Sequence, residues 1–245
     1  MSVRDKAVMI TGAASGIGRA AALLLASNGA RLMLSDRHAE RLDHVRAEIE
    51  ASGGTAQTFA ADVSEPAQVR DLVAATRERF GRIDVLVHAA GVCPRCPVLH
   101  MSDEAWREVL SVNLDGTFYV ARDVARVMSD QRAGTIILLT SDRGVYGSID
   151  YAHYAASKGG TIALVKSLAM SVGQYGVTVN GINPGMTDTP MGRSAVKQWE
   201  EKTRMDVLGR YSLPEEIADI VLFLAGTAGA FMTGQILGVR MRHGA

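Results

Sequence analysis

The stretch TGAASGIG (Thr11–Gly18) follows a short apolar run, Ala7–Ile10. Glycine allows a tight turn and a close backbone approach to a ligand, and the start of a helix presents free N–H groups to a phosphate. The stretch therefore predicts a strand, a glycine-rich turn and a helix, with Gly12, Gly16 and Gly18 cradling a pyrophosphate. The alternative is that these glycines only close a strand–helix corner, because their G-x-x-x-G-x-G spacing differs from the common G-x-G-x-x-G.

Outward from this turn, short runs rich in Val, Ile and Leu alternate with longer amphipathic stretches, as in βαβ units of a parallel sheet covered on both faces. We expect strands at Ala7–Ile10, Arg31–Ser35, Gln57–Ala60, Val85–His88, Thr135–Leu139, Val177–Ile182 and Ile236–Val239. We expect helices at Ile17–Asn28, Ala39–Ala51, Pro66–Phe80, Ser102–Met128, Tyr154–Gln174 and Pro214–Ala225. No linker or repeat interrupts the pattern. It predicts an α/β fold with one domain over 1–245, built on a single Rossmann-type, doubly wound, seven-stranded parallel sheet.

The composition excludes several classes of function. The 245 residues include 26 Lys+Arg and 26 Asp+Glu, so no net charge attracts nucleic acid or an anionic membrane. The apolar runs have the length of strands rather than of membrane spans, and no charged-then-apolar leader precedes the first strand. We expect a cytoplasmic protein that binds neither nucleic acid nor membranes.

The two cysteines, Cys93 and Cys96, are too few and too close for a disulfide framework, and we expect reduced thiols. Zinc needs four ligands, and the sequence has neither a second cysteine pair nor suitably spaced histidines. A thioredoxin-type pair would open a helix. We therefore predict no metal and interpret Cys93–Cys96 as a loop.

Asp36 follows the second expected strand, about 20 residues beyond the glycines, where a carboxylate can bind both ribose hydroxyls of an adenosine. It would also repel a 2′-phosphate, which favours NAD over NADP. Arg37 leaves NADP open, because an arginine there can hold that phosphate or stack on adenine. Asp62 and Val63 follow the third strand, where they can meet the adenine edge, although Asp62 can instead cap the next helix.

Tyr154 and Lys158 are four residues apart on one expected helix and share a face. A phenol has an ordinary pKa of about 10, and a nearby cation favours its ionised form. We therefore predict that Tyr154 is a general acid/base whose pKa Lys158 lowers. Ser141 follows the fifth strand at the edge where open α/β sheets bind ligands, and its hydroxyl can bind a substrate oxygen.

In this order, the motifs resemble those of the short-chain dehydrogenase/reductase family over nearly the whole chain. The matching residues are Thr11–Gly18, Asn113, Ser141, Tyr154–Lys158, Asn180, Pro184-Gly185, Thr189, Pro214–Ala218 and Thr233–Gln235. The resemblance implies reversible hydride transfer, with Asn113, Ser141, Tyr154 and Lys158 as catalytic residues. Asn113 would hold a water of the proton relay, and Lys158 would also bind the nicotinamide ribose. The other implied cofactor contacts are Gly12, Ser15, Gly16, Ile17, Gly18, Asp36, Arg37, Asp62, Val63, Ala89, Gly91, Pro184, Gly185, Thr187 and Thr189.

The sequence departs from the family pattern at two places. His88-Ala89-Ala90-Gly91 stands where Asn-Asn-Ala-Gly is frequent. We interpret His88 as a strand-end histidine with satisfied hydrogen bonds, and we expect the missing amides to cost bonds between neighbouring strands. The C-terminal residues 239–245 also lack the frequent Asp-Gly-Gly, which bears on packing between subunits.

We predict a secondary alcohol or ketone substrate that is small and hydroxylated, with 3-oxoacyl-thioester reduction as the alternative. Ser167–Gly176 on the active-site helix lacks the arginines with which carrier-protein reductases dock their partner. Polar groups expected around the pocket support a hydroxylated substrate: Arg95, Asp142, Arg143, Tyr146, Tyr151 and His153, together with Met186.

Two further expectations concern assembly and the absence of catalysis. The family resemblance implies a homotetramer that associates through the helices Ser102–Met128 and Tyr154–Gln174. A different class of function, a sensor that binds NAD without turnover, would need none of Asn113, Ser141, Tyr154 and Lys158. The presence of all four favours an enzyme.

Overall fold

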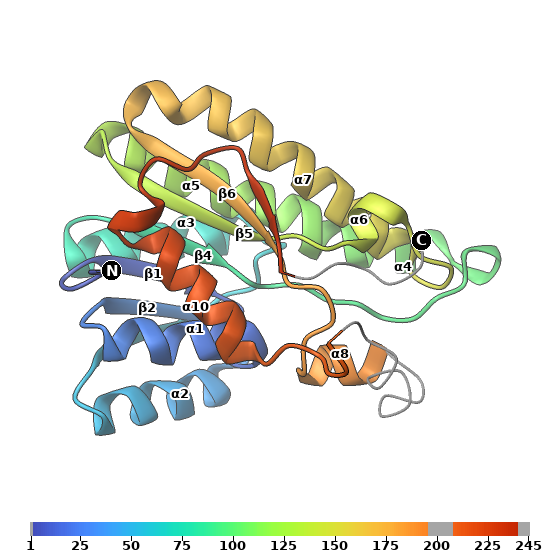
Figure 1. Cartoon of the computed structure of the whole chain (residues 1–245), viewed down its shortest axis with the longest axis horizontal. Coiled ribbons are helices and arrows are strands. Elements are labelled where there is room, and N and C mark those ends of the chain that lie inside the picture. The colour runs from blue at the N-terminus through green and yellow to red at the C-terminus, as the bar shows by residue number, and fades with distance from the viewer. Residues whose placement is uncertain (1, 196–207, 240–245) are drawn as a thin grey trace.

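β1 (Ala7–Thr11) is an interior strand of a seven-stranded parallel sheet in the computed structural model, which describes residues 2–195 and 208–239 (Figure 1). The strand order is β3-β2-β1-β4-β5-β6-β7, so the order reverses between β1 and β4. The other strands are β2 (Arg31–Asp36), β3 (Thr55–Ala60), β4 (Val85–His88), β5 (Gly134–Leu139), β6 (Val177–Asn183) and β7 (Ile236–Gly238). This confirms the predicted doubly wound parallel sheet. The single domain predicted over 1–245 includes residues outside the described ranges and stays a prediction, and 240–245 of the atypical C-terminus also lie outside them.

The β1 residues alternate between the two faces of the sheet. Val8 and Ile10 pack into a core with α1 (Gly16–Ser27) and α10 (Pro214–Ala225), whereas Met9 packs into a second core with α3 (Pro66–Phe80) and α5 (Gly116–Gln131). Figure 1 shows α1, α2 and α10 on one side of the sheet and α3, α5 and α7 on the other. The α-helices are α1 (Gly16–Ser27), α2 (Ala39–Ala51), α3 (Pro66–Phe80), α4 (Asp103–Leu110), α5 (Gly116–Gln131), α6 (Arg143–Tyr146), α7 (Ala152–Val172), α8 (Pro190–Ala195) and α10 (Pro214–Ala225).

The expected helix over Ser102–Met128 is wrong in one respect, because α4 and α5 are separated by a π-helical turn, η2 (Ser111–Asp115). A π turn holds one residue more than an α turn and is frequent at functional sites. This turn carries the buried Asn113. Short 3₁₀ turns that the sequence did not reveal are η1 (Val98–His100), η3 (Gly173–Tyr175) and η4 (Thr227–Gly229).

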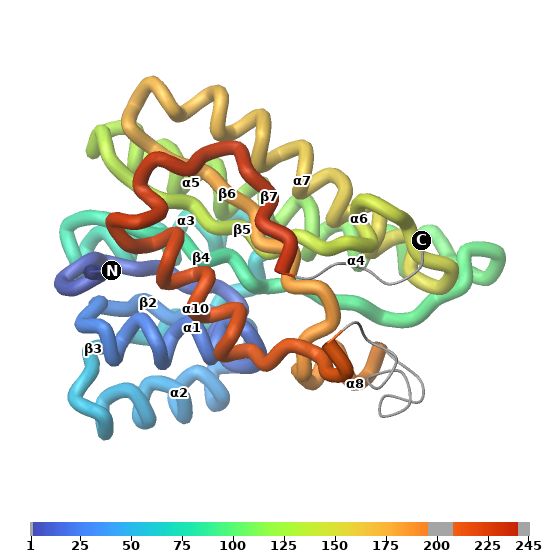
Figure 2. The backbone as a smooth tube through the Cα atoms, in the orientation of Figure 1, coloured from blue at the N-terminus to red at the C-terminus, as the bar shows by residue number. Residues whose placement is uncertain are grey.

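The segments beyond the carboxyl ends of the strands assemble the site. α4, α6 and α8 lie beyond this edge of the sheet, as the backbone trace in Figure 2 shows. Neither α6 nor α8 is predicted by helical periodicity, because each spans less than two turns. The turn after β1 opens at the same edge, beside the point where the strand order reverses, which is where ligands bind in such sheets.

Candidate active site

The glycines after β1 bring three backbone segments together. Gly12 has φ +70°, and a Cβ on it would lie 2.6 Å from the carbonyl carbon of Ala89, which follows β4. A Cβ on Gly18 would overlap the Gly12 carbonyl oxygen. Gly12 and Gly18 are thus required by the strand–helix corner itself, and the corner also borders a pocket. The two interpretations of the glycine stretch are therefore compatible.

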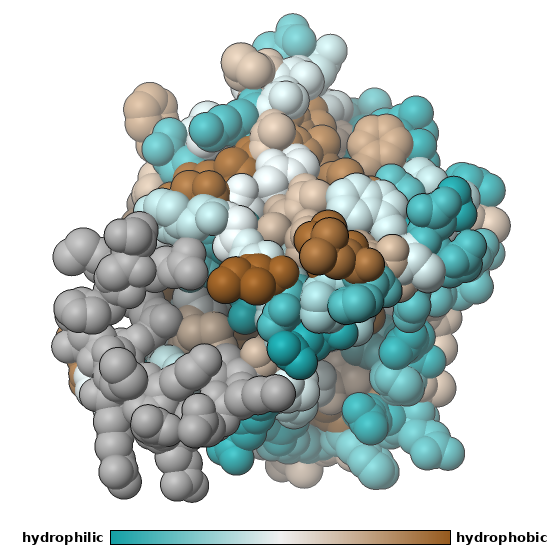
Figure 3. All heavy atoms as spheres, turned by 90° about the vertical axis from the view of Figure 1, so that its right-hand side faces the viewer, coloured by the Kyte–Doolittle hydropathy of each residue, from teal (hydrophilic) through white to brown (hydrophobic). Residues whose placement is uncertain are grey.

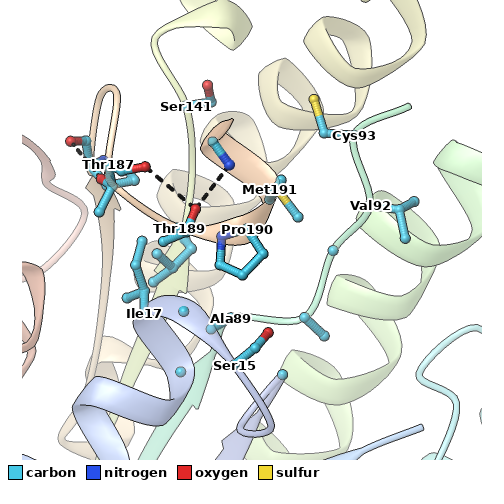
Figure 4. Close-up of a pocket in the computed structure, with 18 of the residues that line it drawn as sticks. Ser15, Ile17, Ala89, Val92, Cys93, Ser141, Thr187, Thr189, Pro190 and Met191 are labelled. Carbon is cyan, nitrogen blue, oxygen red and sulfur yellow. Dashed lines mark hydrogen bonds between the residues drawn. The ribbon is translucent and has the colours of Figure 1, made fainter. Parts of the chain in front are cut away.

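The pocket has a volume of about 300 Å³ and runs from the glycine turn to Tyr154 and Lys158 on α7. Figure 4 shows Ser15 and Ile17 at one end, with Ser141 and Cys93 toward the other. Nearly all the predicted site residues line it: Gly12, Ser15, Gly16, Ile17, Gly18, Asp36, Arg37, Asp62, Val63, Ala89, Gly91, Ser141, Tyr154, Lys158, Pro184, Gly185, Thr187 and Thr189. The one exception is Asn113, which is buried behind the wall. The glycine turn fits a dinucleotide, because Gly12, Gly16 and Gly18 line the pocket without a side chain and let a ligand approach the backbone.

Asp36 ends β2 at the border of the pocket. Its carboxylate accepts hydrogen bonds from the backbone N–H groups of Ala14, at 3.4 Å, and His38, at 3.1 Å. Asp62 accepts from the backbone and hydroxyl of Ser64, so it holds its own loop as well as lining the pocket. The sequence did not single out His38 and Arg41, which line this end too. His38 is the N-cap of α2 and Arg41 lies in its first turn, and this place directly after β2 is the signal that identifies them afterwards.

Lys158 is buried, and its ammonium donates a hydrogen bond of 2.7 Å to the carbonyl oxygen of Leu139 at the end of β5. It lies 5.8 Å from the centre of the Tyr154 ring. Burial lowers the pKa of Lys158 to about 8. The lysine is thus fixed beside the tyrosine by the end of a neighbouring strand.

The expectation that Lys158 lowers the Tyr154 pKa is wrong, because Lys158 is not among the groups that shift it. Burial raises the pKa of the Tyr154 phenol, and Cys93 adds to the rise. The groups that lower the pKa are the Ser141 hydroxyl, by a hydrogen bond, and the Arg143 guanidinium, by its charge. The phenol therefore rests protonated at neutral pH.

Ser141 follows β5, as the sequence predicts, and its hydroxyl is oriented by the next two residues. It accepts a hydrogen bond from the Arg143 backbone N–H at 3.2 Å and donates one to the Asp142 carboxylate at 3.3 Å. These contacts fix a hydroxyl at the pocket wall beside the Tyr154 phenol. The pair can bind one substrate oxygen from two directions.

Asn113 is clamped by the strand-end loop after β4. Its side-chain oxygen accepts from the Val92 N–H at 2.8 Å, and its amide nitrogen donates to the Val92 carbonyl oxygen at 2.8 Å. The same amide nitrogen donates to the Ser157 hydroxyl at 3.3 Å. The side chain thus joins the π turn, the pocket wall and α7.

The expectation that the missing amides at His88-Ala89 cost hydrogen bonds between neighbouring strands is wrong, because His88 makes such bonds itself. Its Nδ1 lies 2.8 Å from the Thr11 hydroxyl and its Nε2 lies 2.9 Å from the Thr117 hydroxyl. Because Thr117 donates to the Asn113 carbonyl oxygen at 2.6 Å, it accepts from Nε2–H, and Nδ1 accepts from Thr11. Burial is the main cause that lowers the His88 pKa to about 3. A neutral His88 therefore ties β4 to β1 and to α5, and it is not placed to act on a substrate.

The loop after β6 covers the middle of the pocket. Thr187 is buried and forms a backbone bridge and a hydroxyl contact of 3.1 Å with Ser212. The Thr189 hydroxyl accepts from the Gly192 N–H at the start of α8 (Figure 4). The contacts of Thr187 with Ser212 attach the loop to the segment that precedes α10, and the Thr189 contact attaches it to α8. The predicted contacts of Thr187 and Thr189 with the cofactor stay predictions.

The substrate end of the pocket is less polar than the sequence suggests. Asp142, Arg143 and Met186 line it. Tyr151 and His153 are buried behind the wall, and Arg95 pairs with Asp150. Among the described residues, neither these three side chains nor Tyr146 lines the pocket. The face at this end mixes hydrophilic and hydrophobic side chains (Figure 3). Large apolar side chains exposed in the segments around it are Val98, Leu99, Val145 and Ile149.

The cysteines lie in a loop, as predicted, and both are free thiols. Cys93 lines the pocket, and burial raises the pKa of its thiol. Within residues 2–195 and 208–239, no three His, Cys, Asp or Glu side chains come together in a way that could hold a metal ion. In the same part of the chain, no helix is both long and apolar enough to cross a membrane.

The sheet, the glycine turn and the Tyr154–Lys158 pair at one pocket define a dinucleotide-binding oxidoreductase of Rossmann type. A family model described as enoyl-(acyl carrier protein) reductase matches residues 12–240. The 3-oxoacyl-(acyl-carrier-protein) reductase FabG of Thermotoga maritima is 37% identical over 240 residues, which cover 98% of each chain.

Other relatives carry different names. The L-rhamnose 1-dehydrogenase (NAD(P)(+)) of Azotobacter vinelandii is 36% identical over 245 residues, covering 97% of this chain and 96% of its own. The crystal structure of levodione reductase superposes with a TM-score of 0.92 at 34% identity, covering 96% of this chain and 97% of its own. The chain belongs to the short-chain dehydrogenase/reductase family. It is an oxidoreductase that acts on CH–OH groups with a nicotinamide dinucleotide.

Proposed function

We propose that the protein interconverts a small polar secondary alcohol and its ketone with NAD as the hydride carrier. The observation that carries this proposal is the continuous pocket that Asp36 borders at one end and Ser141, Tyr154 and Lys158 border at the other. An adenosine ribose at Asp36 would leave the length of the pocket for the pyrophosphate and nicotinamide. The reacting carbon would then lie at the tyrosine.

The catalytic residues act on the proton. In reduction, the Tyr154 phenol donates its proton to the substrate oxygen. In oxidation, the phenol first loses its proton to water, and the resulting phenolate accepts the alcohol proton. Ser141 holds the same substrate oxygen. Lys158, fixed by Leu139, would bind the nicotinamide ribose and take part in returning the proton to water with Asn113. When bound, the nicotinamide accepts or supplies the hydride, which is chemistry that no side chain provides.

Asp36 supports NAD in preference to NADP. Its carboxylate is held at the pocket by Ala14 and His38, where it would accept bonds from ribose hydroxyls and repel a 2′-phosphate. Arg37 and Arg41 at the same end offer positive charge and keep NADP as the alternative. The ratio of kcat/KM for NAD⁺ and NADP⁺ decides between them.

A free small substrate is favoured over a carrier-bound acyl thioester. The outer part of α7, Ser167–Val172, and the turn that follows it bear no arginine that could dock an acidic carrier protein. A sugar dehydrogenase among the relatives is compatible with a hydroxylated substrate, while another relative is named for a carrier-protein substrate. Reduction of a 3-oxoacyl thioester therefore stays the second candidate.

The testing experiment measures NAD⁺ reduction by NADH absorbance against polyols, sugars, secondary alcohols, hydroxy acids and 3-hydroxyacyl thioesters. Turnover confined to free polar alcohols supports the proposal. Turnover of thioesters alone overturns the substrate class. Tight NADH binding without turnover of any alcohol would instead support the alternative function, a sensor that binds NAD without catalysis.

Assembly and location complete the proposal. We expect a homotetramer, because apolar and aromatic side chains remain exposed on α5 and α7, among them Phe118 and Met170. These helices also border a second hollow that contains Leu164, Leu168 and Tyr175. Sedimentation of the full chain tests this expectation. The cytoplasmic location expected from the sequence is tested by fractionation.

A further inference from the structure

Arg143 is held in the catalytic pocket by a close contact between two helices. It is the first residue of α6, directly after Ser141 and Asp142. The next residue, Gly144, meets α7 so closely that a Cβ on it would lie 2.6 Å from the backbone nitrogen of Gly159. Since α7 also carries Tyr154 and Lys158, this contact fixes the backbone of Arg143 relative to the catalytic side chains.

The guanidinium of Arg143 has neutral partners. Its Cζ lies 4.0 Å from the centre of the buried Tyr151 ring and 6.0 Å from that of Tyr154. Its Nη1 donates to the Cys93 sulfur at 3.4 Å. Ring faces and a thiol hold the cation in place while neutralising none of its charge. A guanidinium has five N–H donors, so most of them stay available to a ligand.

No carboxylate of the described residues lies within 4.0 Å of the Arg143 guanidinium nitrogens. The nearby Arg95 is different, because it forms a 2.7 Å ion pair with Asp150. Asp142, the adjacent acid, accepts its hydrogen bond from Ser141 instead. With Asp142 negative and Arg143 and Lys158 positive, the charges at this end sum to about one positive unit at neutral pH. The substrate end therefore offers an open cation beside the reacting position.

We propose that Arg143 binds a carboxylate of the substrate, so that the natural substrate is a small hydroxy acid or the corresponding keto acid. This inference rests on the proposed function and specifies its substrate class. A planar guanidinium matches a carboxylate with two parallel hydrogen bonds, which fix orientation as well as position. With the acid at Arg143, the substrate hydroxyl reaches Ser141 and Tyr154.

The reaction balances with the cofactor already proposed. The hydroxyl proton passes to the Tyr154 phenolate and the hydride on the carbinol carbon passes to NAD⁺. The alcohol is oxidised to the ketone and NAD⁺ is reduced to NADH. The carboxylate leaves unchanged, so Arg143 contributes binding and orientation and transfers no proton.

The test uses binding as well as turnover. Short straight-chain hydroxy acids and the matching hydroxy amides are titrated into the enzyme–NADH complex, where alcohols cannot react, and NADH fluorescence reports binding. We expect the best acid to bind at least about tenfold more tightly than its amide, the size of a charged hydrogen bond. In Arg143→Met, this preference is expected to fall about 10- to 100-fold, and Arg143→Lys keeps part of it.

Arg95→Met is the matched control, because Arg95 lies near the same tyrosine, is paired and does not line the pocket. It is expected to keep the preference for acids. Equal binding of acid and amide to the wild-type complex overturns the inference. A preference that survives in Arg143→Met also overturns it, because Lys158 would then be the source.

The two proposals fail in different ways. Absent NADH binding, or no turnover of any alcohol, contradicts the proposed function. If polyols or sugars are oxidised and no hydroxy acid binds better than its amide, the proposed function is supported and carboxylate binding by Arg143 is contradicted. If the preference for acids in binding depends on Arg143 but no alcohol is oxidised, carboxylate binding by Arg143 is supported and the proposed oxidoreductase activity is contradicted.

Discussion

The two ends of the pocket are built in different ways: the end at the glycine turn is here called the backbone end, and the end at Tyr154 the side-chain end. At the glycine turn the wall is mostly backbone, and Gly12 and Gly18 are required because other segments pass within contact distance of them. At Tyr154 the wall is mostly side chains, and two of them, Ser141 and Lys158, are oriented by hydrogen bonds with the residues at the end of β5 and directly after it. A backbone wall admits few substitutions and one kind of ligand. A side-chain wall lets the substrate change while the cofactor remains.

The largest expected effect is at the side-chain end. Tyr154→Phe removes the proton donor and leaves the ring, so kcat is expected to fall by about 10²- to 10⁴-fold, while the Kd for NADH changes by less than about threefold. Stopped-flow turnover and NADH fluorescence titration measure the two quantities. Near-normal turnover in this variant would remove Tyr154 from the mechanism.

Gly12→Val tests the backbone end. The new side chain would meet the Ala89 backbone and occupy a φ of +70°, so the free energy of unfolding should fall by about 2–4 kcal/mol. NADH affinity should fall with it. Gly173→Ala is the control, since a Cβ at Gly173 has no atom within 4 Å and the backbone there is helical. Urea unfolding compares the variants, and equal losses in both would show that the close approach at Gly12 is unimportant.

Asp36 tests whether the backbone end selects the nucleotide through one charge. Asp36→Ala removes the repulsion of a 2′-phosphate, and the ratio of kcat/KM for NAD⁺ over NADP⁺ is expected to drop by about 10- to 100-fold. Arg37 and Arg41 then become available to the phosphate. An unchanged ratio would assign cofactor choice to the arginines.

The last effect appears only below neutral pH and concerns His88, which ties β4 to β1 and α5. Its pKa in the folded protein is about 3, below the value of about 6.5 in an unfolded chain. Between these values the unfolded state binds one more proton, so stability is full above pH 6.5 and declines toward pH 3 by about 1.4 kcal/mol per pH unit. His88→Asn is expected to flatten this slope in urea melts taken from pH 7 to pH 4. An equally steep slope in the variant would assign it to other groups.

The sequence predicted the backbone end more completely than the side-chain end. The glycine turn and Asp36 are local patterns, and their spacing along the chain follows from the geometry of one strand–turn–helix unit. Helix bounds such as Ala39–Ala51 and Pro66–Phe80 were predicted correctly because their caps and breakers are also local. The left-handed φ angles of Gly53 and Gly81, which end these helices, fit the same local signals.

Side-chain contacts that depend on distant segments were the ones missed. The hydrogen bonds of His88 connect residues 77 and 29 positions apart, so no window of sequence contains them. The same is true of Arg143 and Cys93, which are 50 positions apart. Burial, which raises the Tyr154 pKa, likewise depends on the whole fold, and for that reason the i,i+4 spacing of Tyr154 and Lys158 gave the wrong direction.

The π turn Ser111–Asp115 has a consequence for insertions and deletions in this segment. One residue corresponds to a rotation of about 100° around an α-helix. Removing one residue there would give a continuous α-helix, but it would turn the following helix relative to the preceding one. The side chain of Phe118, exposed on α5, would change direction together with Asn113. Changes of chain length at this point therefore alter the outer surface and the contacts of Asn113 with the pocket wall at once, whereas substitutions can alter them separately.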